Sequence, residues 1–235
     1  MDIDTLKRRA AHRAVEFLKP DMVIGLGSGS TTKFALERIA ELLGTHRLEG
    51  VRGVPSSEET AKIARSLDIP LTTLDENSLL DVNIDGADEV DPQLNLIKGG
   101  GGALLREKVL AQAARRNIFI VDGGKLSPSL GMRWPVPVEV LPFALKSVER
   151  YLISLGASVN SRRNATGRLL QTDQGNIVLD ADFGPIPDPI QLAGCLADRA
   201  GLIEHGLFIG LTHDLIVADA NGIRHLQSAS IASTH

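Results

Sequence analysis

Residues 85–108 of this chain combine acids, a lysine and a run of glycines in a way that suggests chemistry. The stretch reads DGADEVDPQLNLIKGGGGALLREK. Four consecutive glycines are costly, because glycine loses the most backbone freedom on folding. They indicate either close approach of the backbone to a ligand or backbone dihedrals that other residues cannot reach. Charged groups on both sides of such a loop point to a polar ligand and proton transfer. The candidates are Asp85, Asp88, Lys98, Gly99, Gly100, Gly101, Gly102 and Glu107.

Glu107 is the candidate general base. On a helix that begins near Ala103, helical spacing puts Glu107 on the stripe that faces the core. That stripe contains Leu104, Leu110, Ala111 and Ala114. A carboxylate is rarely buried without a reason, and a position in a cleft suits proton abstraction. The alternative is a solvated glutamate that pairs locally with Arg106 or Lys108.

Asp85, Asp88 and Lys98 each have a functional and an ordinary interpretation. The two aspartates follow a predicted parallel strand, at the sheet edge where ligands of open α/β sheets collect, but Asp-Gly is also common turn chemistry. Lys98 and neighbouring N–H groups would stabilise a developing oxyanion, or Lys98 is a surface charge. The DGADEVD run lacks the spacing of a calcium loop, and we expect no metal.

A second glycine turn, VIGLGSGSTTKF, has the features of a phosphate site. Unpaired backbone N–H groups and the helix dipole favour an anion at the start of the following helix. Ser28, Ser30 and Thr31 add hydroxyl groups. The turn matches neither a Walker loop nor a dinucleotide fingerprint, so a helix cap remains the alternative. Lys125, which ends FIVDGGK, lies either at the same ligand edge or in a surface turn.

Alternating strands and helices predict the α/β scaffold that positions these groups. Apolar runs predict strands at 22–27, 51–54, 82–88 and 117–122, with a short candidate at 71–74. Periodicity predicts helices at 4–18 (capped by Asp4), 31–43, 56–67 and 103–116. Such an order predicts a parallel sheet with helices on both faces.

The pattern changes after about residue 130. The proline-rich segment 133–142 suits an extended crossover or an edge strand. After it we predict a helix at 144–155, strands at 157–162 and 177–183, a helix at 190–200 and a strand at 206–211. This βαββαβ-like order predicts a small α+β domain of the split-βαβ, ferredoxin-like type. A hairpin turning at Asn221-Gly222 follows, and the tail at 227–235 is expected to fray.

Composition excludes several classes of function. The formal net charge of −4 gives no general attraction to nucleic acid or to an anionic membrane. No apolar run approaches the roughly 20 residues of a membrane helix, and we expect no signal peptide. Cys195 is the single cysteine, which excludes an intrachain disulfide and fits a reducing cytosol.

VIGLGSGSTTKF, VNIDGADEVDPQLNLIKGGGGALLREK and VDGGK, in this order and spacing, resemble ribose-5-phosphate isomerase of the A type. The resemblance spans the chain. It implies a Rossmann-like domain over 1–130 plus 206–235 and an α+β lid or oligomerisation domain over 131–205. It also implies interconversion of ribose 5-phosphate and ribulose 5-phosphate without a cofactor, in the non-oxidative pentose phosphate pathway. A cytoplasmic homodimer, or a dimer of dimers, is the implied assembly.

The same resemblance implies roles residue by residue. Substrate binding falls on Ser28, Gly29, Ser30, Thr31, Asp85, Gly86, Ala87, Asp88, Lys98, Gly99, Gly100, Gly101, Lys125 and Lys7. Glu107 is the implied base, Asp85 with Asp88 assists opening of the sugar ring, and Lys98 stabilises the oxyanion. Ser28 departs from the usual threonine but keeps a hydroxyl.

Other functions remain open at this point. One is a non-catalytic phosphosugar-binding sensor, which would need an output module. Another is an amino-sugar phosphate deaminase, or an acyl-CoA transferase, on a related fold. The second domain and the spacing between Lys98 and Glu107 favour the pentose isomerase.

Overall fold

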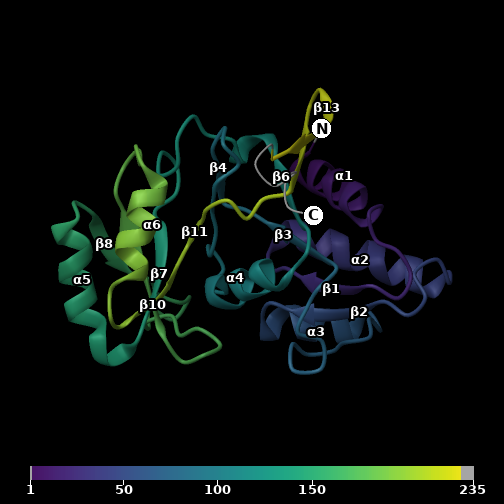
Figure 1. Cartoon of the computed structure of the whole chain (residues 1–235), viewed down its shortest axis with the longest axis horizontal. Coiled ribbons are helices and arrows are strands. Elements are labelled where there is room, and N and C mark those ends of the chain that lie inside the picture. The colour runs from purple at the N-terminus through teal and green to yellow at the C-terminus, as the bar shows by residue number, and fades with distance from the viewer. Residues whose placement is uncertain (1, 229–235) are drawn as a thin grey trace. The chain divides into compact units, whose positions relative to one another are not determined.

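The structure, a computed structural model, describes residues 2–228 of the 235-residue chain. Two compact units divide the chain (Figure 1): a first unit of residues 1–87, 106–125 and 211–235, and a second unit of 88–105 and 126–210. The predicted boundaries, 1–130 plus 206–235 against 131–205, differ from this division at 88–105, at 126–130 and at 206–210. They stay a prediction, because compactness alone does not show which parts fold independently. From residue 229 on, the predicted frayed tail lies outside the described residues.

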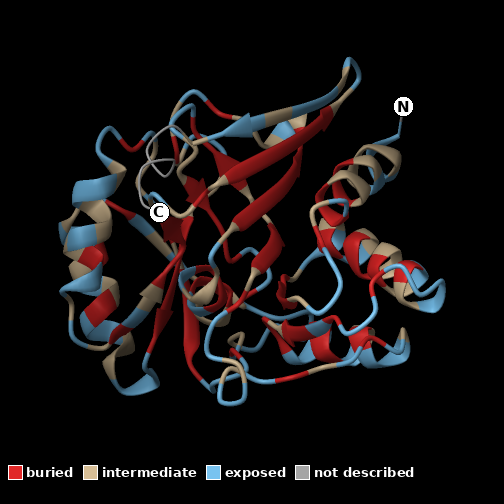
Figure 2. Ribbon diagram, turned by 45° about the vertical axis from the view of Figure 1, so that its right-hand side comes forward, coloured by how far each residue is buried: buried red, intermediate tan, exposed pale blue. Residues whose placement is uncertain are grey.

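A six-stranded sheet forms the centre of the first unit, in the order β13-β12-β6-β3-β1-β2. The strands are β1 (Val23–Leu26), β2 (Arg52–Pro55), β3 (Val82–Gly86), β6 (Asn117–Asp122), β12 (Asp214–Asp219) and β13 (Gly222–Gln227). All neighbouring strands are parallel except β12 and β13, which form the predicted C-terminal hairpin. Figure 2 shows the inner strands buried and β13 largely exposed. The predicted parallel sheet is confirmed.

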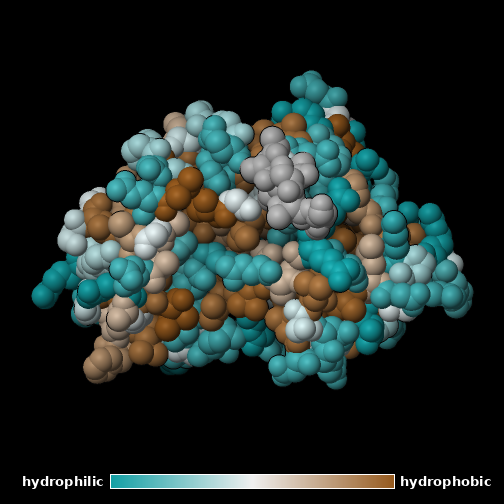
Figure 3. All heavy atoms as spheres, in the orientation of Figure 1, coloured by the Kyte–Doolittle hydropathy of each residue, from teal (hydrophilic) through white to brown (hydrophobic). Residues whose placement is uncertain are grey.

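Helices pack on both faces of this sheet. They are α1 (Ile3–Val15), α2 (Ser30–Gly44), α3 (Glu58–Ser66) and α4 (Leu104–Ala113), with a 3-10 turn, η1, at Gly123–Lys125. Ile24 of β1 joins the main core with α1 and α2, whereas its neighbour Val23 joins a separate cluster with Leu110 of α4. Successive strand residues face opposite sides, so the two clusters lie on opposite faces. The outer end of α2 is covered by hydrophilic side chains (Figure 3).

Two local predictions in the first unit are wrong. Asp2, not Asp4, caps α1, because the Asp2 carboxylate accepts the Thr5 N–H at 2.9 Å. No strand forms at 71–74, where Leu71 makes a single bridge to Gly53. The chain then turns, and the Thr72 hydroxyl donates to the Glu76 carboxylate at 2.6 Å.

The second unit contains the predicted split-βαβ fold. Its antiparallel sheet has the order β10-β7-β9-β8. The elements are β7 (Val136–Val140), η2 (Pro142–Ala144), α5 (Leu145–Ser154), β8 (Ser158–Ser161), β9 (Ile177–Asp182), α6 (Pro189–Ala197) and β10 (Leu202–His205). The fourth strand is therefore at 202–205 rather than at 206–211. Cys195 lies on α6, half-buried and unbonded to another cysteine.

The proline-rich segment forms an inner strand and not an edge strand, because β7 pairs with β9 on one side and with β10 on the other. Pro137 lacks an N–H for the ladder, but pairing with β10 extends only to Val138. Beyond that point the Pro137 carbonyl accepts the Gly206 N–H at 2.7 Å, which needs no donor from the proline.

A small sheet that the sequence did not predict lies in the second unit. Its strands are β4 (Glu89–Val90), β5 (Leu96–Ile97) and β11 (Leu207–Phe208), in the order β11-β5-β4. Glu89 is fully buried, and its carboxylate accepts the N–H groups of Gly131 at 2.9 Å and of Arg133 at 3.2 Å. Lys98 follows β5 directly, so this sheet positions it.

A buried carboxylate joins β12 to β13 and to the start of β6. Asp214 is 1% exposed and receives two hydrogen bonds from Arg116, at 2.6 and 2.9 Å. His225 and Gln227 of β13 lie 2.7 and 3.0 Å from the same carboxylate. Burial alone raises the pKa of Asp214, but the bonds from Arg116, Gln227 and His225 outweigh it and lower the pKa to about 2.

This carboxylate makes stability depend on pH in acid. Because the folded-state pKa is below the unfolded value, the contribution is present above about pH 4 and is lost as pH falls through about 2. The loss amounts to about 2 kcal/mol. Between pH 5 and pH 2, the free energy of unfolding in urea should therefore fall more for the wild type than for Asp214→Asn. Equal falls would contradict this assignment.

Candidate active site

The turn between β1 and α2 is built against the end of β3. Gly27 donates its N–H to the Ile84 carbonyl at 2.9 Å. Gly29 has a φ of 98°, a conformation that favours glycine, and forms the N-cap of α2. The first N–H groups of α2 are left for a ligand or water, as at any helix start. The predicted phosphate loop is thus a glycine turn that leads into a helix of 15 residues.

Asp85 lies against this turn. Its side chain is 1% exposed, and its Oδ1 accepts the N–H of Ser28 at 3.2 Å and of Gly86 at 2.7 Å. A Cβ at position 27 would stand 2.2 Å from that oxygen. Only glycine at 27 therefore allows the carboxylate to approach the turn so closely.

Glu107 lies at the start of α4 and is 4% exposed. The Ser28 hydroxyl donates to its Oε1 at 2.5 Å. Arg106 instead pairs with Glu58 of α3 at 3.0 Å. The burial predicted from the apolar stripe is confirmed, and a solvated Glu107 is excluded. Ser28 thus contacts both candidate acids of this site. Its N–H donates to Asp85, and its hydroxyl donates to Glu107.

A cation lies beside the start of α2. Lys7 reaches from α1 and donates to the Ser30 hydroxyl at 3.0 Å. Its ammonium also lies 3.9 Å from Asp4. An ammonium near a helix N-terminus adds to the positive end of the helix dipole, so an anion would be favoured here. The structure thus places Lys7 beside the turn, and its part in substrate binding stays a prediction.

Lys125 ends the 3-10 turn η1 that follows β6, and it is half-buried. Within that turn, the Asp122 carboxylate accepts the Gly124 N–H at 2.9 Å. Because β6 is parallel to β3, the turn lies at the same carboxyl edge of the sheet as Asp85. Lys125 therefore lies at the edge where ligands of open α/β sheets collect, and its part in binding stays a prediction.

The glycine loop and Lys98 belong to the second unit. Lys98 is 3% exposed, with its ammonium 5.5 Å from the ring centre of Phe208. Its N–H donates to the Gly206 carbonyl at 2.9 Å. Asp88 accepts the Gly100 N–H at 2.7 Å. Asp88 therefore supports the glycine loop, whereas Asp85 supports the Ser28 turn, so the two aspartates have different local partners.

One residue that was not predicted from the sequence contacts this loop. Arg162 donates to the carbonyls of Gly99 and Gly100, at 2.7 and 3.0 Å, and also pairs with Asp180. More than 60 residues separate Arg162 from the glycines. Its segment carries only a strand pattern, so no local signal pointed to it.

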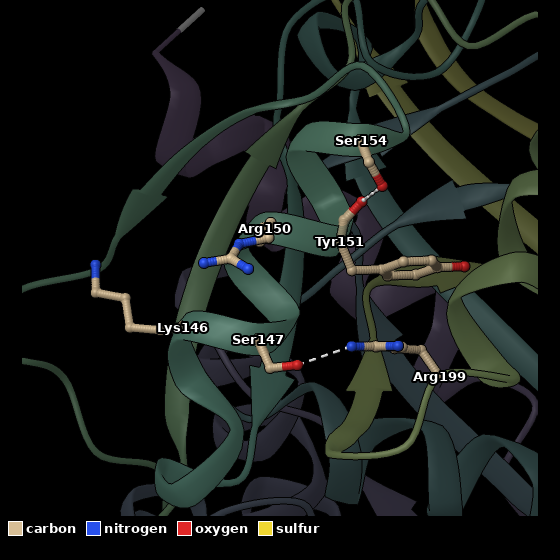
Figure 4. Close-up of a pocket in the computed structure, with 6 residues that line it drawn as sticks. All are labelled: Lys146, Ser147, Arg150, Tyr151, Ser154 and Arg199. Carbon is tan, nitrogen blue, oxygen red and sulfur yellow. Dashed lines mark hydrogen bonds between the residues drawn. The ribbon is translucent and has the colours of Figure 1, made fainter.

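A pocket of 480 Å³ in the second unit contains none of the predicted residues. Its lining residues are Lys146, Ser147, Arg150, Tyr151, Ser154 and Arg199 (Figure 4). Arg199 donates to Ser147 at 2.8 Å and lies over the Tyr151 ring, while Lys146 pairs with Glu149. In Figure 4 the guanidinium of Arg150 points away from Arg199, so the cations do not converge on one ligand.

Within residues 2–228, no group of three or more histidine, cysteine, aspartate or glutamate side chains is arranged to hold a metal ion. Among the helices of the same residues, none has the length and apolar character needed to cross a membrane.

Comparison with known sequences identifies relatives along nearly the whole chain. The family model described as ribose 5-phosphate isomerase A (phosphoriboisomerase A) matches residues 52–222. Ribose-5-phosphate isomerase A of Desulfatibacillum aliphaticivorans is 55% identical over 226 residues, covering 96% of this chain and 98% of that protein. The protein of the same name from Chloroflexus aurantiacus is 54% identical, with 96% and 95% covered.

Solved structures agree with these matches. A D-ribose-5-phosphate isomerase in complex with phospho-erythronic acid has a TM-score of 0.95 and 38% identity, covering 97% of this chain and 100% of that chain. Ribose 5-phosphate isomerase from Plasmodium falciparum has a TM-score of 0.93 and 37% identity, with the same coverage. The predicted fold class and the resemblance are confirmed. The chain belongs to the ribose-5-phosphate isomerase A family.

Proposed function

We propose that the chain interconverts D-ribose 5-phosphate and D-ribulose 5-phosphate through an enediolate, with Glu107 as the general base. The observation that carries the proposal is the buried Glu107 carboxylate, oriented by the Ser28 hydroxyl beside Asp85. The family to which the chain belongs supports the choice of substrate.

The chemistry requires one proton to move between neighbouring carbons. In the open aldose, Glu107 removes the proton on C2, and the electron pair of that bond forms the C1–C2 double bond of the enediolate. The carbonyl oxygen at C1 gains negative charge in this step. Return of the proton to C1 and transfer of the hydroxyl proton from O2 to O1 give the ketose. No oxidant or co-reactant is needed, and Glu107 ends as a carboxylate.

Other residues are proposed to support this step. Lys98 and N–H groups of the glycine loop stabilise the oxyanion, since preorganised donors act strongly on charge that develops during reaction. Asp85 moves the proton of the ring hydroxyl when the furanose opens. Asp88 takes part through the loop that it supports, by the bond to Gly100.

The Ser28–Thr31 turn is proposed to bind the phosphate, with Lys7 and Lys125 contributing positive charge. Support comes from the hydrogen bond between Lys7 and Ser30 at the start of α2. Contacts to a phosphate are remote from the reacting carbons, and binding energy obtained there helps to hold C2 near the base.

The other two functions receive less support. A phosphosugar sensor would not need a carboxylate buried beside a hydroxyl, and a deaminase would share the fold but act on an amino sugar. The named relatives are isomerases that match more than 95% of this chain. We therefore favour the isomerase.

The proposal also covers how the chain assembles and where in the cell it lies. We infer a homodimer, or a dimer of dimers, in the cytoplasm. Support comes from family membership and from large apolar side chains on the surface of the second unit, where Phe143 is 96% and Ile190 67% exposed. Light scattering of the purified chain should give at least twice its mass of 25.1 kDa. A monomer at micromolar concentration would overturn the assembly.

Glu107→Gln removes the base and keeps the shape of the side chain. We expect kcat to fall about 100- to 10,000-fold, the usual contribution of a general base. Binding of phospho-erythronic acid, measured by calorimetry, should survive. Glu59→Gln, an exposed change on α3, is the matched control and should keep wild-type turnover. A kcat for Glu107→Gln close to wild type would show that another group is the base.

Removal of metal ions tests the cofactor-free mechanism. Purified protein treated with EDTA should convert ribose 5-phosphate to ketose at the untreated rate, because lysine and amide groups carry the oxyanion. Loss of activity that returns with a divalent cation would contradict this. If no ketose forms and glucosamine 6-phosphate is consumed instead, the protein is a deaminase.

A further inference from the structure

The guanidinium of Arg162 connects two carbonyls of the glycine loop to a carboxylate on the neighbouring sheet. Nη1 donates to the Gly99 carbonyl at 2.7 Å and to the Gly100 carbonyl at 3.0 Å. Nε lies 3.0 Å from Asp180 Oδ2, and Nη2 bonds to Asp180 Oδ1. Arg162 and Asp180 expose only 15% and 22% of their side chains. A guanidinium that bonds carbonyls on one side and a carboxylate on the other is held in a single orientation.

The backbone around this pair is also fixed. Arg162 follows β8 directly, and its N–H donates to the Val178 carbonyl of β9 at 2.9 Å. Asp180 lies within β9, opposite Asn160 of β8. Both partners therefore rest on a four-stranded sheet, and the guanidinium transmits that rigidity to the loop.

The loop itself has little intrinsic rigidity. Glycine residues reach both signs of φ at low cost, so peptide groups between them turn over easily. The described bonds that oppose such rotation are few: Gly102 donates to the Gly99 carbonyl at 2.9 Å, and Gly100 donates to Asp88 at 2.7 Å. Arg162 is the side chain that holds two successive carbonyls.

Fixing a carbonyl also fixes the N–H of the same peptide group. In a trans peptide the C=O and the following N–H point in opposite directions. The peptide of Gly99 thus directs the Gly100 N–H away from Arg162, where Asp88 accepts it. By the same geometry the peptide of Gly100 directs the Gly101 N–H away from Arg162. Gly101 is exposed, and its N–H donates to no residue in 2–228.

We propose that Arg162, held by Asp180, is a positioning residue that orients the Gly100–Gly101 peptide so that the Gly101 N–H is presented to the substrate oxygen that becomes negative. This inference rests on the proposed isomerase function. The cation also polarises the carbonyl of that peptide, which makes its N–H a stronger donor. Arg162 touches the loop and not the reacting atoms.

The test compares two variants of Arg162 with a neighbour. Arg162→Met removes both donors, and Arg162→Lys keeps the charge but cannot hold the carbonyls and the carboxylate together. Arg163→Met is the matched control, because Arg163 is exposed and its guanidinium donates to the Gly167 carbonyl within its own hairpin. Steady-state kinetics with ribose 5-phosphate and thermal unfolding are measured for the full chain.

We expect kcat of Arg162→Met to fall about 10- to 100-fold, somewhat less than loss of a whole oxyanion donor. KM should change less than about threefold, and Arg162→Lys should recover part of kcat. Affinity for phospho-erythronic acid, whose carboxylate places negative oxygen at the reacting end, should fall with kcat. Affinity for ribitol 5-phosphate, which has no such oxygen, should be unchanged. Arg163→Met should match the wild type.

A purely structural role predicts a different result. Arg162→Lys that folds with wild-type kcat, or equal losses of affinity for the two ligands, would overturn the positioning role. If Arg162→Met does not fold, Arg162→Lys and Asp180→Asn supply the same comparison. Failure of the proposed isomerase function would look different from failure of the positioning role. In that case the wild type itself would lack isomerase activity, and Glu107→Gln would change nothing.

Discussion

The arrangement of acids in the first unit depends on the absence of a side chain at Gly27. A Cβ there would overlap the Asp85 carboxylate, which lies against the turn. Because the contact is possible, Asp85 accepts the Ser28 N–H and holds the turn in place. Ser28 in turn directs its hydroxyl to Glu107. The close approach of one carboxylate to the backbone at Gly27 thus sets the positions of both carboxylates and of the loop that leads into α2.

The second unit uses glycine in the opposite way. At Gly27 a missing side chain allows tight packing, whereas Gly100 and Gly101 are exposed and leave peptide groups accessible. Freedom of this kind is useful for donating N–H groups to a ligand, but it must be limited if those groups are to be preorganised. Asp88 and Arg162 limit the rotation of these peptide groups. Asp88 accepts the Gly100 N–H, and Arg162 donates to the carbonyls of Gly99 and Gly100.

The sequence was sufficient to predict the features that depend on a periodic pattern of apolar residues. Strand and helix periods predicted the parallel sheet, and the apolar stripe predicted that Glu107 is buried. Two-residue strands such as β4 and β5 are too short to show any period. The bond from Arg162 to Gly99 joins residues far apart in the chain, so it leaves no local pattern. The prolines in 133–142 suggested an edge strand, because proline cannot donate to a neighbouring strand. The sequence does not show that pairing with β10 stops at Val138, before Pro137 would have to donate.

The hydroxyl of Ser28 carries a single proton, and this limits what it does during a reaction cycle. While that proton lies in the bond to Glu107, the Ser28 oxygen can accept hydrogen bonds but cannot donate one to a phosphate oxygen. Donation to an anion is then left to the hydroxyls of Ser30 and Thr31, to the N–H groups at the start of α2 and to the Lys7 ammonium. The hydroxyls of one turn therefore have different partners. The Ser28 hydroxyl bonds the general base, whereas the next hydroxyls along the turn remain able to bond the anion.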